Sequence, residues 1–245
     1  MSPYGTLALS DVLQISSERV EPLSFADRSF NYIGLENIEG HTGRVITPGK
    51  TRGSEIQSTK NVFHKGQILY GKLRPYLNKV HLAEEGGICS TDIFVLTCDT
   101  SRMLPSFAAY YLRSESTLET VKNLTVGANL PRVDARSFLS IAIPVPKLSE
   151  QKRIVSILDD AESLRHLRIE ADSLTVAATP ALFQDLFGTQ VASRFGWAIE
   201  SVGNLFCDSR DGVKCGPFGS ALKKDEYSDT GVPVWGIPNG NSSRA

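Results

Sequence analysis

The stretch that comes nearest to a catalytic motif is residues 66–72, where Gly66, Gly71 and Lys72 satisfy the GxxxxGK spacing of a phosphate-binding loop. Such a loop also needs a serine or threonine after the lysine to hold magnesium, and this chain has Leu73 there. The Ile-Leu-Tyr between the glycines is typical of a strand, whereas phosphate binding needs small residues that let backbone N–H groups curl round the anion. An enzyme that uses this loop stays as an alternative that the sequence disfavours.

Other patterns of catalytic or metal-binding residues are absent from the sequence. It has no HExxH, no GxSxG and no dinucleotide-binding fingerprint, and its four histidines are dispersed. Asp159 and Asp160 are consecutive on a predicted helix and point about 100° apart, so we expect them on a solvated face. Four cysteines lie far apart without a CxxC pair and are expected as buried thiols: Cys89, Cys98, Cys207 and Cys215. We therefore predict no metal site, no cofactor and no catalytic role for this chain.

A cluster of basic residues is the stronger chemical signal. The chain has 26 Lys and Arg against 27 Asp and Glu, a net charge of −1 that by itself says nothing about nucleic acid. Residues 50–81, in contrast, hold seven basic residues and one acid, Glu55, so the local charge is +6. Aromatic and amide side chains that can contact bases are interleaved with them. The alternative is a solvated strand surface whose acidic partners come from elsewhere in the fold.

We expect these basic and polar residues to divide by role on DNA. Candidates that neutralise phosphates, and so make affinity fall with salt, are Lys50, Arg52, Lys60, Lys65 and Lys79. Candidates that read base edges, because Arg can pair bidentately with guanine and Asn with adenine, are Arg74, Tyr76, Asn78 and Arg132. Lys72 completes the set of DNA-binding candidates. In the alternative interpretation Arg74 buttresses a loop and touches no base.

The periodicity of the chain predicts a mixed α+β domain that positions these candidates. Two strands are expected around Gly66 and Gly71, another apolar strand over residues 87–99, and one helix over residues 105–124. Residues 40–60 are rich in Gly, Thr, Ser and Lys and are expected to form a surface loop. A further strand enters a proline-rich joint, so the domain is predicted to close near Pro146.

A long amphipathic helix is predicted over residues 147–188, with Ser149 as its N-cap. Its apolar residues recur in steps of three and four and form one stripe: Ile154, Ile157, Ala161, Leu164, Leu167, Ala171 and Leu174. Roughly 27 residues before Pro180 would span about 40 Å, which is longer than one small domain covers, so a partner helix is favoured. The alternative is that the stripe lies on the core of its own domain.

Residues 189–245 are predicted to begin a second domain. Residues 198–206 resemble residues 8–14, and VWGIPNGN resembles YIGLENIEG in the same order, which indicates a second copy of one module. A piece of this size is too short to bury a complete core. With no run of 18 apolar residues and no signal-peptide pattern, we expect neither a membrane span nor a secretion signal, and a cytoplasmic location.

Taken in order, several segments resemble the DNA-specificity (S) subunit of type I restriction-modification systems: GQILYGKLRPYLNKV, GICSTDIFVL, VGANLPRVDARSF, IAIPVPKLSEQKRIVSILDDAESL and GPFGSALKKDEYSDTGVPVWG. The resemblance covers the whole chain. It implies a target recognition domain over residues 1–146, a spacer helix over residues 147–188 and a truncated second recognition domain over residues 189–245. In that family two such helices pack antiparallel and also dock methyltransferase (M) subunits.

The resemblance also implies the division of labour. The chain would read double-stranded DNA and direct adenine methylation by M subunits and, with a restriction (R) subunit, cleavage. S-adenosylmethionine, ATP and magnesium are expected on those partner subunits. Because one spacer helix is present, its stripe is expected to pair with a second copy, and the homodimer would read an inverted repeat. The alternative is a truncated remnant that binds the M subunit through the helix without useful DNA readout.

Overall fold

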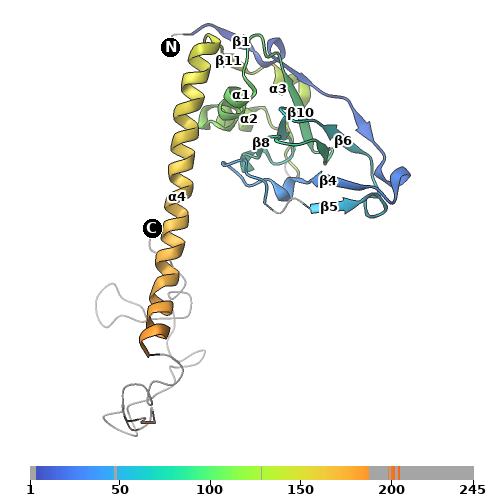
Figure 1. Cartoon of the computed structure of the whole chain (residues 1–245). Coiled ribbons are helices and arrows are strands. Elements are labelled where there is room, and N and C mark those ends of the chain that lie inside the picture. The colour runs from blue at the N-terminus through green and yellow to red at the C-terminus, as the bar shows by residue number, and fades with distance from the viewer. Residues whose placement is uncertain are drawn as a thin grey trace, which may run out of the picture. The chain divides into compact units, whose positions relative to one another are not determined.

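The computed structural model in Figure 1 describes residues 4–46, 49–127 and 129–187, together with residues 198, 200, 201 and 204. The chain divides into two compact units, residues 1–172 and 173–245, and each is considered by itself. Apart from those four single positions, the predicted second recognition domain lies outside the described residues, as do Cys207 and Cys215.

An antiparallel four-stranded sheet forms the centre of the first unit. Its strand order is β2 (Leu13–Ile15), β10 (Ile93–Cys98), β7 (Ile68–Gly71) and β8 (Val80–Leu82). β7 and β10 read as nearly continuous apolar runs because both of their faces are buried. On β7, Ile68 and Tyr70 enter one hydrophobic cluster and Leu69 enters another, since successive side chains of a strand point to opposite faces.

A second, five-stranded sheet packs on this one. Its order is β3 (Arg19–Val20), β6 (Lys60–Phe63), β9 (Gly87–Cys89), β4 (Ser29–Ile33) and β5 (Gly49–Arg52), with β4 and β9 parallel and the other neighbours antiparallel. Ile33 and Phe63 of this sheet pack against Leu69 and Val95 of the first. Phe30 and Ile88 form a smaller cluster on the other face.

Three helices cover the remaining face of the four-stranded sheet: α1 (Pro105–Arg113), α2 (Glu115–Leu124) and α3 (Ala135–Leu139). We predicted one helix over residues 105–124, and the structure breaks it at Ser114. This residue is extended, with φ −63° and ψ 149°, and its hydroxyl accepts a hydrogen bond from the backbone N–H of Thr117 at 3.3 Å. A serine in this geometry caps a new helix, so the chain turns and starts α2.

Two other expectations for this domain are corrected. Residues 40–60 are not only loop, because β5 adds to the edge of the five-stranded sheet, where exposed polar side chains are tolerated. Residues 87–99 form two strands, β9 and β10, that belong to different sheets. Short 3₁₀ turns join the strands at Leu9–Asp11, Pro22–Phe25, Leu35–Asn37, Gly53–Glu55 and Pro75–Leu77.

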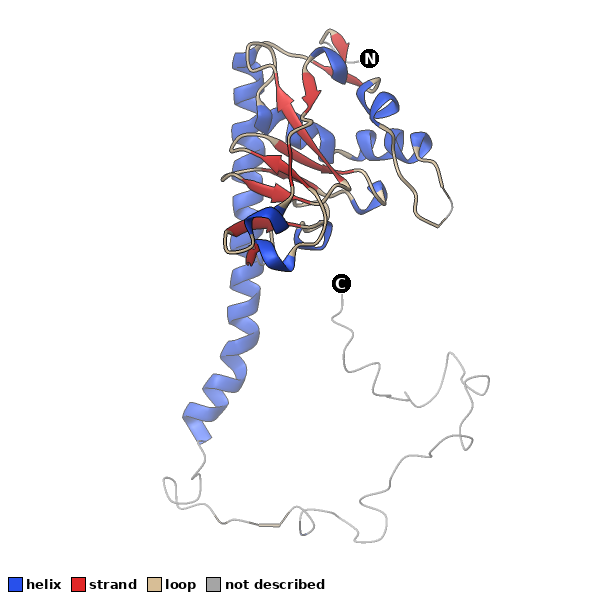
Figure 2. Ribbon diagram, turned by 90° about the vertical axis from the view of Figure 1, so that its right-hand side faces the viewer, coloured by secondary structure: helices blue, strands red, loops and turns tan. Residues whose placement is uncertain are grey.

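The joint between the domain and the long helix is a two-stranded pair of β1 (Thr6–Ala8) and β11 (Ala142–Pro144). α4 (Leu148–Phe187) follows, and its first turns run beside α1 (Figures 1 and 2). The predicted α+β domain followed by a long helix is thereby confirmed.

The N-cap of α4 differs from expectation, whereas its last residue, Phe187, lies one residue before the predicted end. The helix begins at Leu148, so Ser149 lies inside its first turn and is not the N-cap. The backbone N–H groups of Glu150 and Gln151 instead donate to the carbonyl of Lys147, at 2.9 and 3.0 Å. Pro180 lies inside the helix and does not end it, at the cost of one backbone hydrogen bond.

Candidate nucleic-acid interface

Two loops near the end of β7, residues 72–77 and residues 126, 127 and 129–132, join to form what we call the two-loop cluster. The backbone N–H of Arg74 donates to the carbonyl of Pro131 at 2.8 Å, and Leu73 and Arg132 form a β-bridge. Because backbone hydrogen bonds link the two loops, the side chains that they carry keep a common frame. The fold brings Arg132 beside two DNA-binding candidates from a distant part of the sequence, Lys72 and Arg74.

The cations of the two-loop cluster are largely free of strong internal pairing. Arg132 Nη2 lies 3.2 Å from Asp92 Oδ1, and the Arg132 side chain is 51% exposed. A surface ion pair of this kind contributes about 0–1 kcal/mol, so it leaves the guanidinium available to a stronger anion. Arg74 is exposed, and Lys72 Nζ lies 5.2 Å from the ring centre of Phe94. Of these three cations, only Arg132 forms an ion pair with another of the described residues, so the cluster offers positive charge suited to phosphate.

The turn at Pro75–Leu77 carries an exposed aromatic residue, Tyr76, and the residues on either side of the turn have an unusual backbone conformation. Arg74 and Asn78, which flank the turn, have φ of 50° and 49°. Such left-handed geometry costs about 1–2 kcal/mol per non-glycine residue, so packing elsewhere must compensate for it. It leaves Tyr76 45% exposed and Leu77 40% exposed. An exposed aromatic ring beside cations can stack on a base or sugar.

The remaining basic residues do not form one patch with the two-loop cluster. Lys50 on β5 pairs with Asn31 on β4, so both side chains lie on one face of the five-stranded sheet. Lys60 Nζ lies 5.7 Å from the ring centre of Tyr32, which alternates with Asn31 and therefore faces the other side. Residues that are close in sequence are thus divided between two faces of a sheet.

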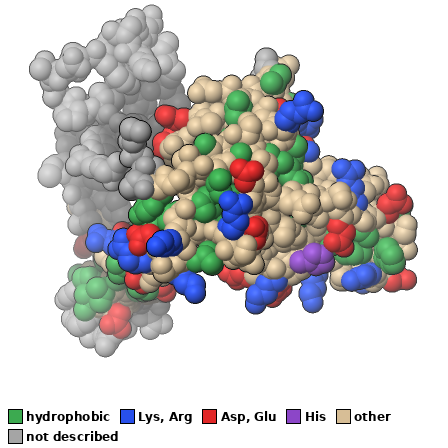
Figure 3. Space-filling model, turned by 90° about the horizontal axis from the view of Figure 1, so that it is seen from above, with side chains coloured by type: hydrophobic (Ala, Val, Ile, Leu, Met, Phe, Trp, Pro, Cys, Tyr) green, Lys and Arg blue, Asp and Glu red, His purple; other side chains and the backbone are tan. Residues whose placement is uncertain are grey.

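Two further basic candidates are exposed. Arg52 lies on the edge strand two residues after Lys50 and is exposed, and Lys65 is exposed in the turn after β6. Figure 3 shows Lys and Arg side chains at several separate places on the face in view, with Asp and Glu among them. Because Lys50 and Lys60 lie on opposite sheet faces and Lys79 is partly buried, residues 50–81 do not form a single continuous basic patch.

Two candidates turn inward and are corrected. Asn78 is 3% exposed, and its side-chain amide donates to the carbonyl of Arg113 at 2.8 Å, so it is not placed to read a base. Lys79 Nζ donates to the carbonyl of Leu35 at 2.6 Å and is partly buried. For Asn78 the residue type offered one signal of a structural role, because asparagine is among the few residues that adopt left-handed backbone geometry.

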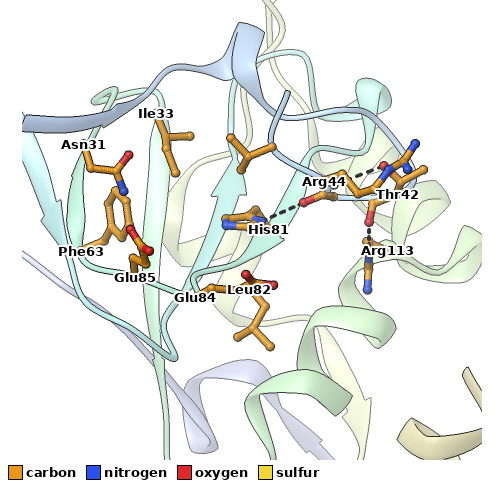
Figure 4. Close-up of a pocket in the computed structure, with 12 residues that line it drawn as sticks. Asn31, Ile33, Thr42, Arg44, Phe63, His81, Leu82, Glu84, Glu85 and Arg113 are labelled. Carbon is orange, nitrogen blue, oxygen red and sulfur yellow. Dashed lines mark hydrogen bonds between the residues drawn. The ribbon is translucent and has the colours of Figure 1, made fainter. Parts of the chain in front are cut away.

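A hollow of about 560 Å³ lies beside these inward-facing residues (Figure 4). His81 Nδ1 donates to the carbonyl of Gly43 at 2.8 Å, and Arg113 donates to the carbonyl of Thr42. Burial lowers the pKa of His81, so this imidazole is neutral at pH 7. Gly43 has φ +70°, and a Cβ there would clash with the carbonyl oxygen of Val80. The polar groups at this end of the hollow thus support the turn at residues 39–44.

The described residues offer little for covalent or metal chemistry. Cys89 and Cys98 are buried, and burial raises the pKa of each thiol to about 12, so neither is a ready nucleophile. Within the described ranges, no group of three or more His, Cys, Asp or Glu residues could hold a metal ion. Among the helices of that same part of the chain, none is long and apolar enough to cross a membrane.

Residues 1–172 match the family model described as the type I restriction modification DNA specificity domain. The chain belongs to this family. In sequence it is 28% identical over 152 residues to the EcoDI specificity subunit of Escherichia coli. This alignment covers 62% of the present chain and 33% of the relative. It is 35% identical over 78 residues to the MjaVIII specificity subunit of Methanocaldococcus jannaschii, covering 32% and 18%.

Solved structures agree with this family in fold. The crystal structure of the HsdS subunit from Thermoanaerobacter tengcongensis has a TM-score of 0.58 at 24% identity, over 76% of this chain and 50% of that one. A chain from a structural study of assembly and conformational transition in a type I R-M system gives 0.60 at 25% identity, over 81% and 52%. The present chain therefore spans about half the length of these solved relatives. Specificity subunits are non-catalytic, so the prediction that this chain is not an enzyme is confirmed.

The spacer helix of this specificity-domain chain has two apolar faces. Ile154 and Val155 pack on the hydrophobic cluster of the recognition domain, and Leu158 is partly buried. Ile154, which we assigned to the stripe, therefore belongs to the face that covers its own domain. The other stripe residues are exposed: Ile157, Ala161, Leu164, Leu167, Ala171 and Leu174. The interpretation that the stripe lies on the core of its own domain thus holds for Ile154, and pairing of the exposed residues with a partner helix stays a prediction.

Proposed function

We propose that this chain is a sequence-reading subunit of a type I restriction-modification assembly. It would bind double-stranded DNA and direct adenine methylation by a partner M subunit and, where an R subunit joins, cleavage. The observation that carries the proposal is the family match over residues 1–172, which includes the whole two-loop cluster. Such a protein works where the chromosome lies, so we propose a cytoplasmic location.

Exposure divides the proposed DNA-binding residues into two groups. The two-loop cluster offers Arg74, Arg132 and Tyr76 for base edges or stacking, with Lys72 at its root. Lys50, Arg52 and Lys65 are exposed and suited to phosphates, and removing any cation that binds a phosphate should reduce the salt dependence of binding by a slope of about 0.9. Lys60 lies on the opposite sheet face from Lys50, so we expect at most one of these two to meet the DNA.

The exposed stripe of α4 supports the proposed assembly. Leu164 and Leu167 are 67% and 59% exposed on a helix that is already anchored by its other face. A second copy that lays the same stripe against it would bury both rows, and a twofold axis would then relate two recognition domains. We propose that the M subunit docks on the same helix pair. S-adenosylmethionine, ATP and magnesium would belong to the partner subunits.

The first experiment measures mass by light scattering, for the chain alone and mixed with the M subunit of the same genome. A dimer that takes up two M subunits supports a working specificity subunit. A monomer that ignores the M subunit contradicts it. If the M subunit binds but DNA affinity shows no sequence preference, the chain is an assembly module and the DNA-reading role is wrong.

A single substitution tests the stripe. Leu164→Glu places a charge in the proposed helix pair and should convert the dimer to a monomer without unfolding the recognition domain. Ser163→Glu is the matched control, because it adds the same charge to an exposed neighbour outside the stripe. Equal masses for parent and Leu164→Glu would refute dimerisation through this stripe.

A further inference from the structure

The root of α4 is anchored to the recognition domain by one buried amide. Gln151 is 0% exposed. Its Oε1 accepts from the backbone N–H of Leu104 at 2.8 Å, and its Nε2 donates to the carbonyls of Arg102 and Pro146 at 2.8 and 2.9 Å. Both amide protons are therefore used, and the helix is tied to two separate backbone segments. This anchor holds the position of the first turn.

Farther along the same helix, polar contacts form a second anchor. Tyr110 Oη on α1 donates to Asp159 Oδ1 on α4 at 2.6 Å. Arg44 Nη1 lies 3.2 Å from Nδ1 of His166, which accepts because arginine only donates. From Gln151 to His166 the helix rises about 22 Å at 1.5 Å per residue. We call these contacts, together with Gln151, the helix seam.

The domain side of the helix seam is itself braced. The turn that carries Arg44 is held by His81 through Gly43 and by Arg113 through Thr42 (Figure 4). The Arg113 guanidinium lies 4.5 Å from the ring centre of Tyr110. Arg44 and Tyr110, the two domain residues that contact the outer part of α4, are thus themselves held by other parts of the domain.

Polar contacts at Gln151, Asp159 and His166 extend over about 22 Å of the helix and fix its direction more firmly than the apolar contacts at Ile154, Val155 and Leu158, which cover a shorter length. We propose that the helix seam sets the spacing between the two DNA half-sites, by fixing the angle between the recognition domain and α4. This inference rests on the proposed dimeric DNA-reading function. A tilt of about 10° over a lever of about 20 Å moves its end by about 3.5 Å, which is about one base-pair rise. A small change in the helix seam could therefore change the gap, which is the number of base pairs between the two half-sites, by one.

The test compares methylation by the full chain co-produced with its M subunit, on a DNA library in which the gap is randomised in length. Asp159→Ala combined with Tyr110→Phe should keep the half-site sequence and lose roughly tenfold in discrimination between neighbouring gap lengths. Asp160→Ala is the matched control, since it removes a neighbouring exposed carboxylate. Asp159→Asn keeps an acceptor oxygen for Tyr110 and should restore the gap preference of the parent.

A second variant guards against loss of fold. His166 is exposed, and His166→Ala removes only the outer contact while placing a good helix former in α4. It should broaden the gap preference in the same direction. Unchanged gap preference in both variants, with unchanged half-sites, would overturn the inference and leave the proposed function intact. Absence of sequence-selective methylation by the parent would instead defeat the proposed function.

Discussion

The two-loop cluster and the helix seam are built by opposite means. In the cluster, backbone hydrogen bonds hold two loops together and leave Arg74, Tyr76 and Arg132 exposed. In the seam, side chains do the holding, and Gln151 is fully buried with both of its amide protons bonded. Recognition and stability are therefore separable in one region and coupled in the other. Side chains that the fold does not use for its own contacts can be changed to alter recognition, whereas Gln151, buried at the root of the seam, cannot be changed without a large loss of stability.

The largest expected effect is a loss of stability when the helix seam is changed. Gln151→Leu leaves one buried and two partly buried backbone groups without this partner, each costing about 1–3 kcal/mol and less where water reaches the group, so the free energy of unfolding should fall by about 3–5 kcal/mol. Urea unfolding followed by circular dichroism measures it. Lys152→Ala, at the exposed next position, should change this free energy by less than about 0.5 kcal/mol. A loss below about 1 kcal/mol for Gln151→Leu would mean that this amide is no anchor.

The next largest effect is a loss of DNA affinity when the two-loop cluster is changed. Arg74→Ala or Arg132→Ala should weaken binding to DNA that contains the recognised sequence by about 1–3 kcal/mol. The free energy of unfolding should change by less than about 1 kcal/mol. Fluorescence anisotropy over a salt series measures the affinity and its slope. Arg19→Ala, an exposed arginine on β3, serves as the charge-matched control. If Arg19→Ala weakens binding as much as the cluster variants, the reading surface lies elsewhere.

A smaller effect is expected within the helix seam. Tyr110→Phe and Asp159→Ala should be coupled by about 1 kcal/mol in a double-mutant cycle of unfolding free energies, because each removes the same hydrogen bond. The pair of Tyr110→Phe and Asp160→Ala should be additive within about 0.3–0.5 kcal/mol. Additivity in both cycles would show that the hydrogen bond between Tyr110 and Asp159 contributes nothing to holding α4.

The smallest effect concerns pH and the support beneath Arg44. Burial lowers the pKa of His81 in the folded state, so between that pKa and about 6.5 the unfolded chain binds more protons than the folded one. Stability from this group is complete above about pH 6.5 and is lost as the pH falls through the folded pKa. Urea unfolding at a series of pH values should show this loss, and His81→Gln should reduce it. Equal pH dependence in both proteins would contradict the prediction.

The elements of this fold follow closely from local patterns. Alternation and apolar runs predicted strands around Gly66 and Gly71, and the three–four spacing predicted the long helix, because burial against any partner imposes the same periodicity. The break at Ser114 was missed, since a serine between two helical stretches fits either a helix interior or a cap. The second strand in residues 87–99 was missed because a short turn inside an apolar run leaves the hydrophobic pattern unchanged.

Composition and periodicity alone show that the chain carries a basic segment, a long apolar stripe and no recognisable catalytic motif. Which of these residues face solvent depends on the fold. Lys50 and Lys60 lie on opposite faces of one sheet, and Asn78 points inward, while Arg132 joins Arg74 from a distant part of the chain. The physical reason is that side-chain direction depends on strand register and on long-range backbone pairing. Neither of these is encoded in the local spacing of residue types.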